Sequence, residues 1–320
     1  MHNRISRDKR CSYVVLLDEA SKPSRELREL AEYLSMLGVA GCEVIVLDPA
    51  PRQEFEARER ILRWVGRHLS MRFDEPSQPA AAVASYENVI VATEDVRYTP
   101  AAIGQICDHL LHHEVVEPQD YLDPRSWWTR IEASRILVHR AIESRPDPAA
   151  TFAFRRDVVR SLRVLTRFGR HQNPVRRLAA AGAGVHASEV FVRREPAGLT
   201  RWLAQRPGIA GNEFTLPVKT AFFFSLLPLL VLLAIAGGVQ LAARVAAIFA
   251  FSVTALALRG RKGASAYFPL HASLFAPLWL FERSVSVYWA LFRKLRGRDL
   301  VPVHEELPST GVVSTNARHG

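Results

Sequence analysis

Glu94 and Asp95 are adjacent carboxylates whose place in the chain suits metal or phosphate chemistry. They follow residues 89–92, an apolar and β-branched run that predicts a buried strand. Thr99 and Pro100 come soon after and are typical of an N-cap and a first helical residue. Because open α/β sheets bind ligands at the carboxyl ends of their strands, we expect the pair at such an edge. Carboxylate oxygens at this edge can hold a divalent cation, which in turn can hold a diphosphate. The alternative interpretation is an acidic turn exposed to solvent.

The first third of the chain predicts the alternating strands and helices that would position this pair. Strands are expected at residues 12–17, 43–47 and 89–92, and helices at residues 24–37 and about 53–69. The second of these strands ends at Asp48. A strand–helix–strand unit of this kind has parallel strands and a right-handed crossover. Residues 73–85 are rich in Pro, Ala and Ser and predict a loop.

The middle of the chain continues the alternation with shorter elements. Strands are expected at residues 114–117, 151–154 and 185–192, and helices at residues 127–142, at about 157–168 and from Asn173 onward. Residues 197–214 predict an amphipathic segment. We therefore expect an α/β domain over residues 11–215, preceded by a basic arm at residues 1–10 without a signal peptide.

The composition changes sharply after Pro217, where a membrane region is expected over residues 216–298. No charged residue lies between Lys219 and Arg244, and Gly237-Gly238 interrupts the apolar run. A membrane span needs about 20 residues. Two spans, about 218–237 and 239–258, therefore fit, and a buried helical hairpin in a soluble core is the alternative.

Charges and aromatic residues around the apolar runs predict the orientation. Arg and Lys residues precede the first span and follow the second, so both outer ends are expected on the cytoplasmic side. The stretch 266–292 contains Pro, Glu and Arg between aromatic residues and predicts an interfacial helix, with a third span as the alternative. Residues 299–320 predict a flexible tail. The expected location is the cytoplasmic membrane, multi-pass, with the N-terminal domain in the cytoplasm.

The composition limits the classes of partner. The net charge of +10 implies attraction to phosphates, whether in nucleotides, anionic lipids or nucleic acid. The arginines are spread over many elements and form no stripe with stacking aromatics, so no nucleic-acid partner is expected. The three cysteines are far apart and without zinc-binding spacing, which favours a reducing compartment.

Several short motifs, taken in order, resemble those of a family 2 glycosyltransferase of the membrane-bound bacterial type. Such enzymes have a GT-A nucleotide-sugar domain followed by C-terminal membrane helices. The resemblance covers nearly the whole chain and rests on the strand ending at Asp48, on residues 89–100 and 118–124, on Trp127-Trp128, on Phe154-Arg155-Arg156 and on Gln205-Arg206-Pro207. It implies a GT-A-like (Rossmann-like) domain and transfer of a sugar from a nucleotide-diphosphate donor. The acceptor would be a lipid or a glycan at the cytoplasmic face, as in cell-envelope polysaccharide synthesis with other envelope-biosynthesis proteins.

The resemblance also implies roles for individual residues. Asp48 would contact the nucleobase. Thr93, Glu94 and Asp95 occupy the acidic motif, in which Asp95 matches the ligand of a divalent cation, Mg²⁺ or Mn²⁺, and Glu94 compensates for Thr93. The diphosphate would be gripped by basic and amide side chains, namely Arg155, Arg156, Gln205 and Arg206.

The chain departs from the family pattern at the catalytic base. The best match to that position is Gln172-Asn173, and a glutamine cannot take a proton from an acceptor hydroxyl. The usual Asn-Gly-Lys-like element is also missing between the second strand and the acidic tip. The alternative function is therefore a catalytically degenerate relative that acts as a binding or scaffold subunit.

Overall fold

The computed structural model describes residues 9–18, 24–71, 76–123, 126–142, 151–161, 174–212 and 217–296. The chain divides into two compact units. The first comprises Met1–Pro196 and Phe251–Trp279, and the second comprises Ala197–Ala250 and Leu280–Gly320. One long helix, α9 (Pro217–Arg261), belongs to both.

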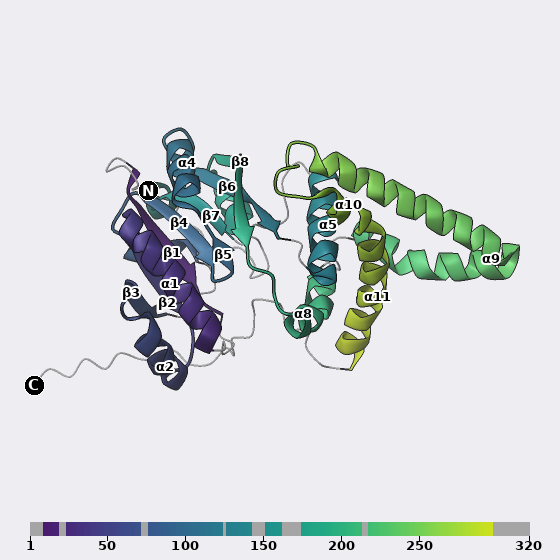
Figure 1. Cartoon of the computed structure of the whole chain (residues 1–320), viewed down its shortest axis with the longest axis horizontal. Helices are drawn as coiled ribbons and strands as arrows, with labels where there is room; N and C mark the ends of the chain where they lie inside the picture. Colours follow the sequence, from purple (N-terminus) through teal and green to yellow (C-terminus); the bar gives the residue numbers. More distant parts are fainter. Residues whose placement is uncertain are drawn as a thin grey trace, which may run out of the picture. The chain divides into compact units, whose positions relative to one another are not determined.

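Within the described part of the first unit, eight strands form one mixed sheet in the order β3-β2-β1-β4-β7-β6-β8-β5 (Figure 1). Four parallel strands make up one half, β1 (Cys11–Leu16), β2 (Glu43–Asp48), β3 (Arg67–Ser70) and β4 (Asn88–Thr93). The other half holds β6 (Val115–Leu122), β7 (Thr151–Arg155), β8 (Val185–Arg194) and the short β5 (Val96–Arg97). β7 is antiparallel to both β4 and β6, whereas β8 is parallel to β6.

Helices cover both faces of this sheet and bury two apolar cores. Helices α1 (Ser24–Ala40) and α4 (Pro100–Leu110) pack on one face, and α3 (Ser77–Val83), α6 (Arg156–Ser161) and α7 (Pro174–Ala180) on the other. Because successive strand residues point to opposite faces, Tyr13 and Val15 enter the first core and Val14 the second. This explains why the strands appear in the sequence as continuous apolar runs.

The α/β sheet and the long apolar helix confirm the fold class predicted from the sequence, but one predicted helix was too long. The helix predicted at about 53–69 ends early as α2 (Arg52–Leu62), and residues 67–70 form β3 beside β2. The two strands approach closely at Gly66, where an added Cβ would lie 2.3 Å from the carbonyl oxygen of Val44. Pairing with a neighbouring strand therefore overrides the local helical pattern.

Two further elements differ from the sequence prediction. The segment 73–85, expected as a loop, contains the short helix α3, whose alanines Ala80 and Ala81 are buried in the second core. The strand expected at 114–117 continues to Leu122 as β6, with an irregularity between Glu117 and Gln119. Pro118 lies at this irregularity, where a proline is tolerated in a sheet.

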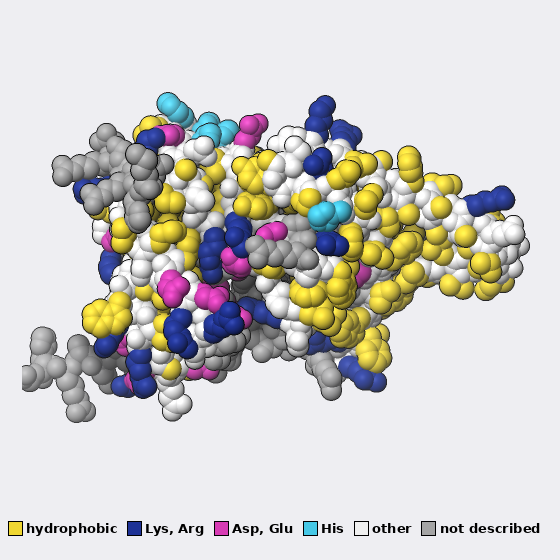
Figure 2. Space-filling view, in the orientation of Figure 1, with side chains coloured by type: hydrophobic (Ala, Val, Ile, Leu, Met, Phe, Trp, Pro, Cys, Tyr) yellow, Lys and Arg dark blue, Asp and Glu magenta, His cyan; other side chains and the backbone are white. Residues whose placement is uncertain are grey.

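Helix α9 is apolar, and its side chains are largely exposed. By length and composition, one helix among the described residues, Val218–Arg261, is suited to cross a membrane, and 11% of its most apolar window is buried. Hydrophobic side chains cover the surface over α9 (Figure 2), including Val231, Leu232, Ile235 and Ile248. Exposed apolar side chains on this scale are typical of a surface that lies in lipid or against a partner.

The long helix turns back on itself at Gly238, next to the break expected from Gly237-Gly238. Gly238 has φ 80° and ψ 165°, outside the helical region and favourable for glycine. The rings of Phe222 and Phe249 lie 6.1 Å apart by their centroids. In a straight helix these residues would be about 40 Å apart along the axis. The two arms of α9 therefore form an antiparallel hairpin.

The remaining helices complete the two units. Helix α5 (Trp127–Ile142) of the first unit packs against α10 (Leu270–Leu274) and against the end of α9. Arg140 Nε donates a hydrogen bond of 3.1 Å to the carbonyl oxygen of Gly260. Helix α8 (Leu199–Asn212) lies in the second unit, and α11 (Ala276–Leu295) begins in the first unit and continues in the second.

Candidate active site

The carboxyl ends of three parallel strands bring several acidic residues to one edge of the sheet. Leu16 of β1 is paired with Leu47 of β2 and with Thr93 of β4. Asp48 and Glu94 follow their paired positions directly, and Asp18 follows Leu16 by two residues. The sheet register therefore brings these three acidic residues to the edge where open α/β folds bind ligands.

Asp48 is fully buried and is held by three donors. One oxygen, Oδ1, accepts hydrogen bonds of 2.9 Å from Ala50 N and from Arg58 Nη1. The other, Oδ2, lies 3.1 Å from His68 Nε2, and the His68 ring stacks on Phe55. Burial raises the pKa of Asp48, but the bonds from His68 and Ala50 and the charge of Arg58 outweigh it, so the pKa falls below its usual value. Contact between Asp48 and a nucleobase stays a prediction.

Arg58 connects this carboxylate to the neighbouring strand end. Its Nη1 also donates to the carbonyl oxygen of Asp18 at 2.9 Å. The backbone N–H of Asp18 in turn donates to Glu94 Oε2 at 3.3 Å. A continuous polar network thus runs from β2 across the end of β1 to the acidic tip of β4.

Asp95 is held by a different arginine, Arg194 at the end of β8. Arg194 Nε donates to Asp95 Oδ2 at 2.6 Å, and the Thr93 hydroxyl donates to Asp95 Oδ1. The backbone N–H of Glu195 also donates to the Asp95 carbonyl oxygen at 2.7 Å. The side chains of Arg194 and Asp95 are 33% and 28% exposed, so solvent or a ligand reaches both.

The ion pair perturbs both of its members. Burial raises the pKa of Asp95, but the charge of Arg194 and the hydrogen bonds from Thr93 and Arg194 overcome it and lower the pKa to about 2. The charge of Asp95 raises the pKa of Arg194 in return. Both groups are therefore charged throughout the neutral range.

The donor set at the tip does not fit the divalent cation predicted at Asp95 and Glu94. Both oxygens of Asp95 already accept hydrogen bonds, from Thr93 and Arg194. Glu94 is buried and directs one oxygen to the Asp18 backbone. Across the described residues, no group of three or more His, Cys, Asp or Glu side chains is arranged to hold a metal ion. Mg²⁺ is usually held by one or two carboxylates together with waters and substrate phosphates, and at this tip the partly exposed carboxylate, Asp95, is already paired with Arg194.

The two arginines at the junction of β7 and α6, Arg155 and Arg156, lie at the opposite end of β4 from the acidic tip. Arg155 is paired with Asn88 at the start of β4, because β7 runs antiparallel to β4. Arg155 forms an ion pair of 2.5 Å with Asp157, and Arg156 donates to the carbonyl oxygen of Ala84 at 2.8 Å. Their contact with the diphosphate stays a prediction.

The other predicted residues lie in the second unit or outside the described residues. Gln205 and Arg206 are in α8. Arg206 is buried, stacks over Trp202 at 4.2 Å and lies 3.6 Å from Glu282. Gln172 and Asn173 fall outside the described residues, so the predicted base position stays a prediction.

Two arginines of the site were missed in the sequence, Arg58 and Arg194. Arg58 lies within an ordinary charged helix, and Arg194 ends a strand next to Arg193. Arg194 is 99 residues from Asp95 in the chain. No local pattern marks either residue, and only the pairing of β8 with β5 brings Arg194 to the tip.

Comparison with known proteins gives distant structural likenesses. No protein-family model matches the chain, and no curated protein is significantly similar to it in sequence. A mannosyltransferase from Pyrobaculum calidifontis, in complex with GDP-Man and Mn²⁺, is 15% identical over 87% of each chain, with a TM-score of 0.43.

A second likeness is glucosyl-3-phosphoglycerate synthase from Mycobacterium tuberculosis, in complex with Mn²⁺, UDP and glucosyl-3-phosphoglycerate. It is 15% identical, with a TM-score of 0.40, over 64% of this chain and 79% of that chain. Both structures therefore belong to the class of protein, glycosyltransferases, that the sequence resembles. Because both TM-scores are below 0.5, no residue role is transferred from either structure.

Proposed function

We propose that this protein is a membrane-bound glycosyltransferase that moves a sugar from a nucleotide-diphosphate donor to a lipid or glycan acceptor. The observation that carries the proposal is the joint edge of β1, β2 and β4, where the Asp48–Arg58 network meets the Asp95–Arg194 pair. This edge combines fixed acidic groups with a partly exposed guanidinium. Such an arrangement is suited to orient a polar, phosphorylated ligand.

The chemistry of sugar transfer makes two demands on this site. The bond between the sugar C1 and the diphosphate oxygen breaks, and negative charge develops on the departing nucleoside diphosphate. A fixed guanidinium such as that of Arg194 stabilises this charge. A bond from C1 to the acceptor oxygen forms, and the acceptor hydroxyl loses its proton. No described residue is assigned as the base that accepts this proton, and the glutamine at the predicted Gln172-Asn173 position cannot act as one.

The hairpin of α9 supports a membrane location for the acceptor step. We propose two spans, about 218–237 and 239–258, joined at Gly238, with both outer ends on the cytoplasmic side. Basic residues before Pro217 and after Leu258 support this orientation. An acceptor carried on a lipid or a growing glycan would then lie at the cytoplasmic face.

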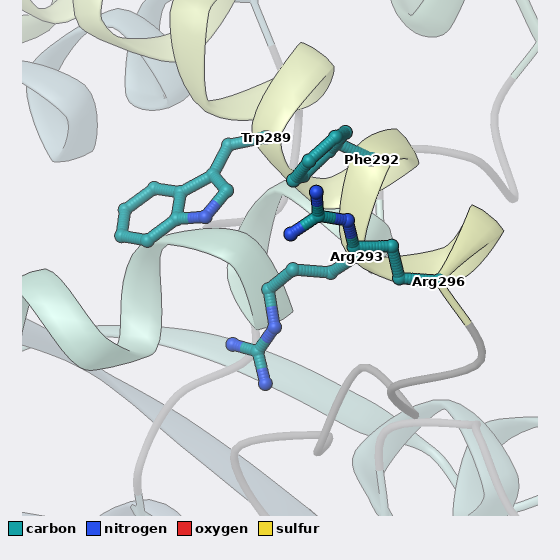
Figure 3. Close-up of a pocket in the computed structure, with 4 residues that line it drawn as sticks. All are labelled: Trp289, Phe292, Arg293 and Arg296. Atoms are coloured by element: carbon teal, nitrogen blue, oxygen red, sulfur yellow. The ribbon is translucent and has the colours of Figure 1, made fainter.

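Helix α11 supports the same location. Trp289, Phe292, Arg293 and Arg296 of the second unit line a shallow hollow of about 280 Å³ (Figure 3). Trp289 and Phe292 are about half exposed, and the Arg296 guanidinium lies over the Phe292 ring at 4.1 Å. Aromatic rings beside arginines are typical of a helix at the level of lipid headgroups. We propose that the second half of α11 lies in the interface.

The test of the proposed function is nucleotide binding by the full chain. UDP and GDP are titrated calorimetrically into the detergent-purified protein, with and without Mn²⁺. We expect one of them to bind with a Kd in the micromolar range, about −8 kcal/mol. We expect Asp95→Ala to weaken this binding at least about tenfold, because Arg194 loses the carboxylate that orients it. Unchanged affinity in this variant would contradict the role of Asp95.

The alternative function predicts a different result from the same titration. A folded protein that binds neither nucleotide, with or without Mn²⁺, supports the degenerate binding or scaffold subunit. In that case a second membrane protein is expected to co-purify with the chain. The missing Asn-Gly-Lys-like element and the Gln172 position motivate this alternative.

A further inference from the structure

We infer that Arg194 supplies the positive charge that a divalent cation would otherwise bring to the diphosphate, so that nucleotide binding by this protein needs no metal ion. The inference rests on the proposed function and deepens it. The side chains at the acidic tip do not match the divalent cation that the sequence resemblance implies.

Arg194 competes with a metal ion for the carboxylate of Asp95. The 2.6 Å contact uses the Nε of the guanidinium and the Oδ2 of the carboxylate. A dication coordinated by the same oxygen would lie close to the guanidinium charge, and the two positive charges would repel strongly. Binding of a metal ion to Asp95 is therefore disfavoured while Arg194 stays in place.

The guanidinium is fixed in place by the backbone as well as by its ion pair. Val96 of β5 is paired with Arg194 of β8, and Glu195 N donates to the Asp95 carbonyl oxygen at 2.7 Å. Backbone contacts of Val96 and of Asp95 therefore hold the β4–β5 turn against the end of β8, next to the Asp95–Arg194 ion pair. A guanidinium held in this way loses little conformational freedom when it binds a ligand.

The terminal amino groups of Arg194 remain suited to a phosphate. The bond to Asp95 uses Nε, so the two amino groups are not part of it, and the side chain is 33% exposed. A guanidinium presents its N–H groups as a planar fork that matches two phosphate oxygens. The charges of Asp95, Asp120 and Glu132 all raise the pKa of Arg194, which keeps the fork charged.

The test repeats the UDP and GDP titrations on the full chain in excess EDTA and in saturating Mn²⁺. We expect the wild-type Kd to differ less than about twofold between the two conditions. Arg194→Ala is expected to weaken binding by about tenfold to a hundredfold in EDTA, because it removes a charge-assisted contact. In Mn²⁺ the loss is expected to be smaller, because Asp95 no longer has Arg194 as its partner. Arg194→Lys keeps the positive charge but lacks the planar fork, and its Kd is expected to lie between those of the wild type and Arg194→Ala.

Two controls separate loss of the fork from loss of folding. Arg193→Ala removes a neighbouring charge on the same strand, whose partner is Glu195 at 3.4 Å, and is expected to bind like the wild type. The double variant Asp95→Asn with Arg194→Gln replaces the ion pair by a neutral one of similar size. We expect this variant, checked by circular dichroism, to lose affinity as Arg194→Ala does.

The outcomes distinguish this inference from the proposed function. Wild-type protein that binds a nucleotide only with Mn²⁺ overturns the inference and leaves the proposed function standing. A folded Arg194→Ala protein with the wild-type Kd in EDTA also overturns the inference. Wild-type protein that binds no nucleotide in either condition overturns the proposed function, and the inference falls with it.

Discussion

At the scale of residues, the two carboxylates of the acidic tip have different partners although they are neighbours in the chain. Glu94 accepts from the backbone N–H of Asp18, whereas Asp95 is paired with Arg194. Both residues lie in the turn between β4 and β5, where the backbone changes direction. Glu94 therefore connects the ends of β4 and β1 inside the protein. Asp95 pairs with Arg194 at a position where both side chains are partly exposed.

The Asp95–Arg194 pair predicts a dependence of stability on pH. The pKa of Asp95 is about 2 in the folded protein, below the value of 3.8 for the free group. A lowered pKa stabilises the folded state by about 2 kcal/mol above pH 4, and this contribution disappears as the pH falls through about 2. We expect wild-type protein to exceed Asp95→Asn in thermal stability at pH 7, and the difference to shrink between pH 4 and pH 2. Melting curves in detergent measure it, and a pH-independent difference would contradict the assignment.

At the scale of elements, the end of α9 packs against α5 with almost no space between the backbones. A Cβ added to Gly260 would lie 1.8 Å from the carbonyl oxygen of Leu137. Arg140 adds a hydrogen bond to Gly260 across the same contact. The absence of a side chain at Gly260 therefore lets the apolar hairpin end on a helix of the α/β unit.

Gly260→Ala is expected to lower the stability of the protein by about 1–3 kcal/mol, because the added methyl group forces the two helices apart. Gly104→Ala is the matched control. Gly104 lies within α4, and an added Cβ there meets no atom within 4 Å. This second substitution is expected to be neutral or to stabilise by up to about 1 kcal/mol, since alanine favours helices. Thermal melting of both variants in detergent tests the pair, and an equal effect of the two would contradict the close contact.

At the scale of the whole molecule, one apolar hairpin distinguishes this chain from a purely α/β protein. The interruption of α9 at Gly238 and the contact of Phe222 with Phe249 give it two arms. Each arm is about the length that a bilayer requires. The proposed orientation, with the turn on the far side of the membrane from the α/β unit, follows from the basic residues at the outer ends.

This orientation predicts which positions a membrane-impermeant maleimide reaches. The three native cysteines are buried, so labelling by the reagent reports an introduced cysteine. We expect Val239→Cys, next to the turn, to be labelled in intact cells, and Lys262→Cys to be labelled only in inside-out vesicles. Labelling of both from the same side would contradict the two proposed spans, because the second span separates residue 239 from residue 262.

The sequence by itself determined the features that depend on neighbouring residues. The apolar runs predicted β1, β2 and β4, the Thr99–Pro100 pair predicted the start of α4, and the Gly-Gly pair predicted the break in the apolar helix. Thr99 indeed accepts a hydrogen bond from Ala102 N at 3.2 Å. Such features follow from the period of apolar residues and from caps and turns, which act within one or two turns of chain.

Only the tertiary structure decided which charges meet at the acidic tip. Residues 67–70 form a strand because β2 offers a free edge, and Arg155 lies away from the tip because β7 is antiparallel. Arg194 reaches Asp95 across 99 residues through the pairing of β8 with β5. Strand direction and register depend on the packing of distant segments, and no local pattern encodes them. The sequence therefore predicted which strand ends carry the acidic residues, whereas the arginine that pairs with Asp95 emerged only from the fold.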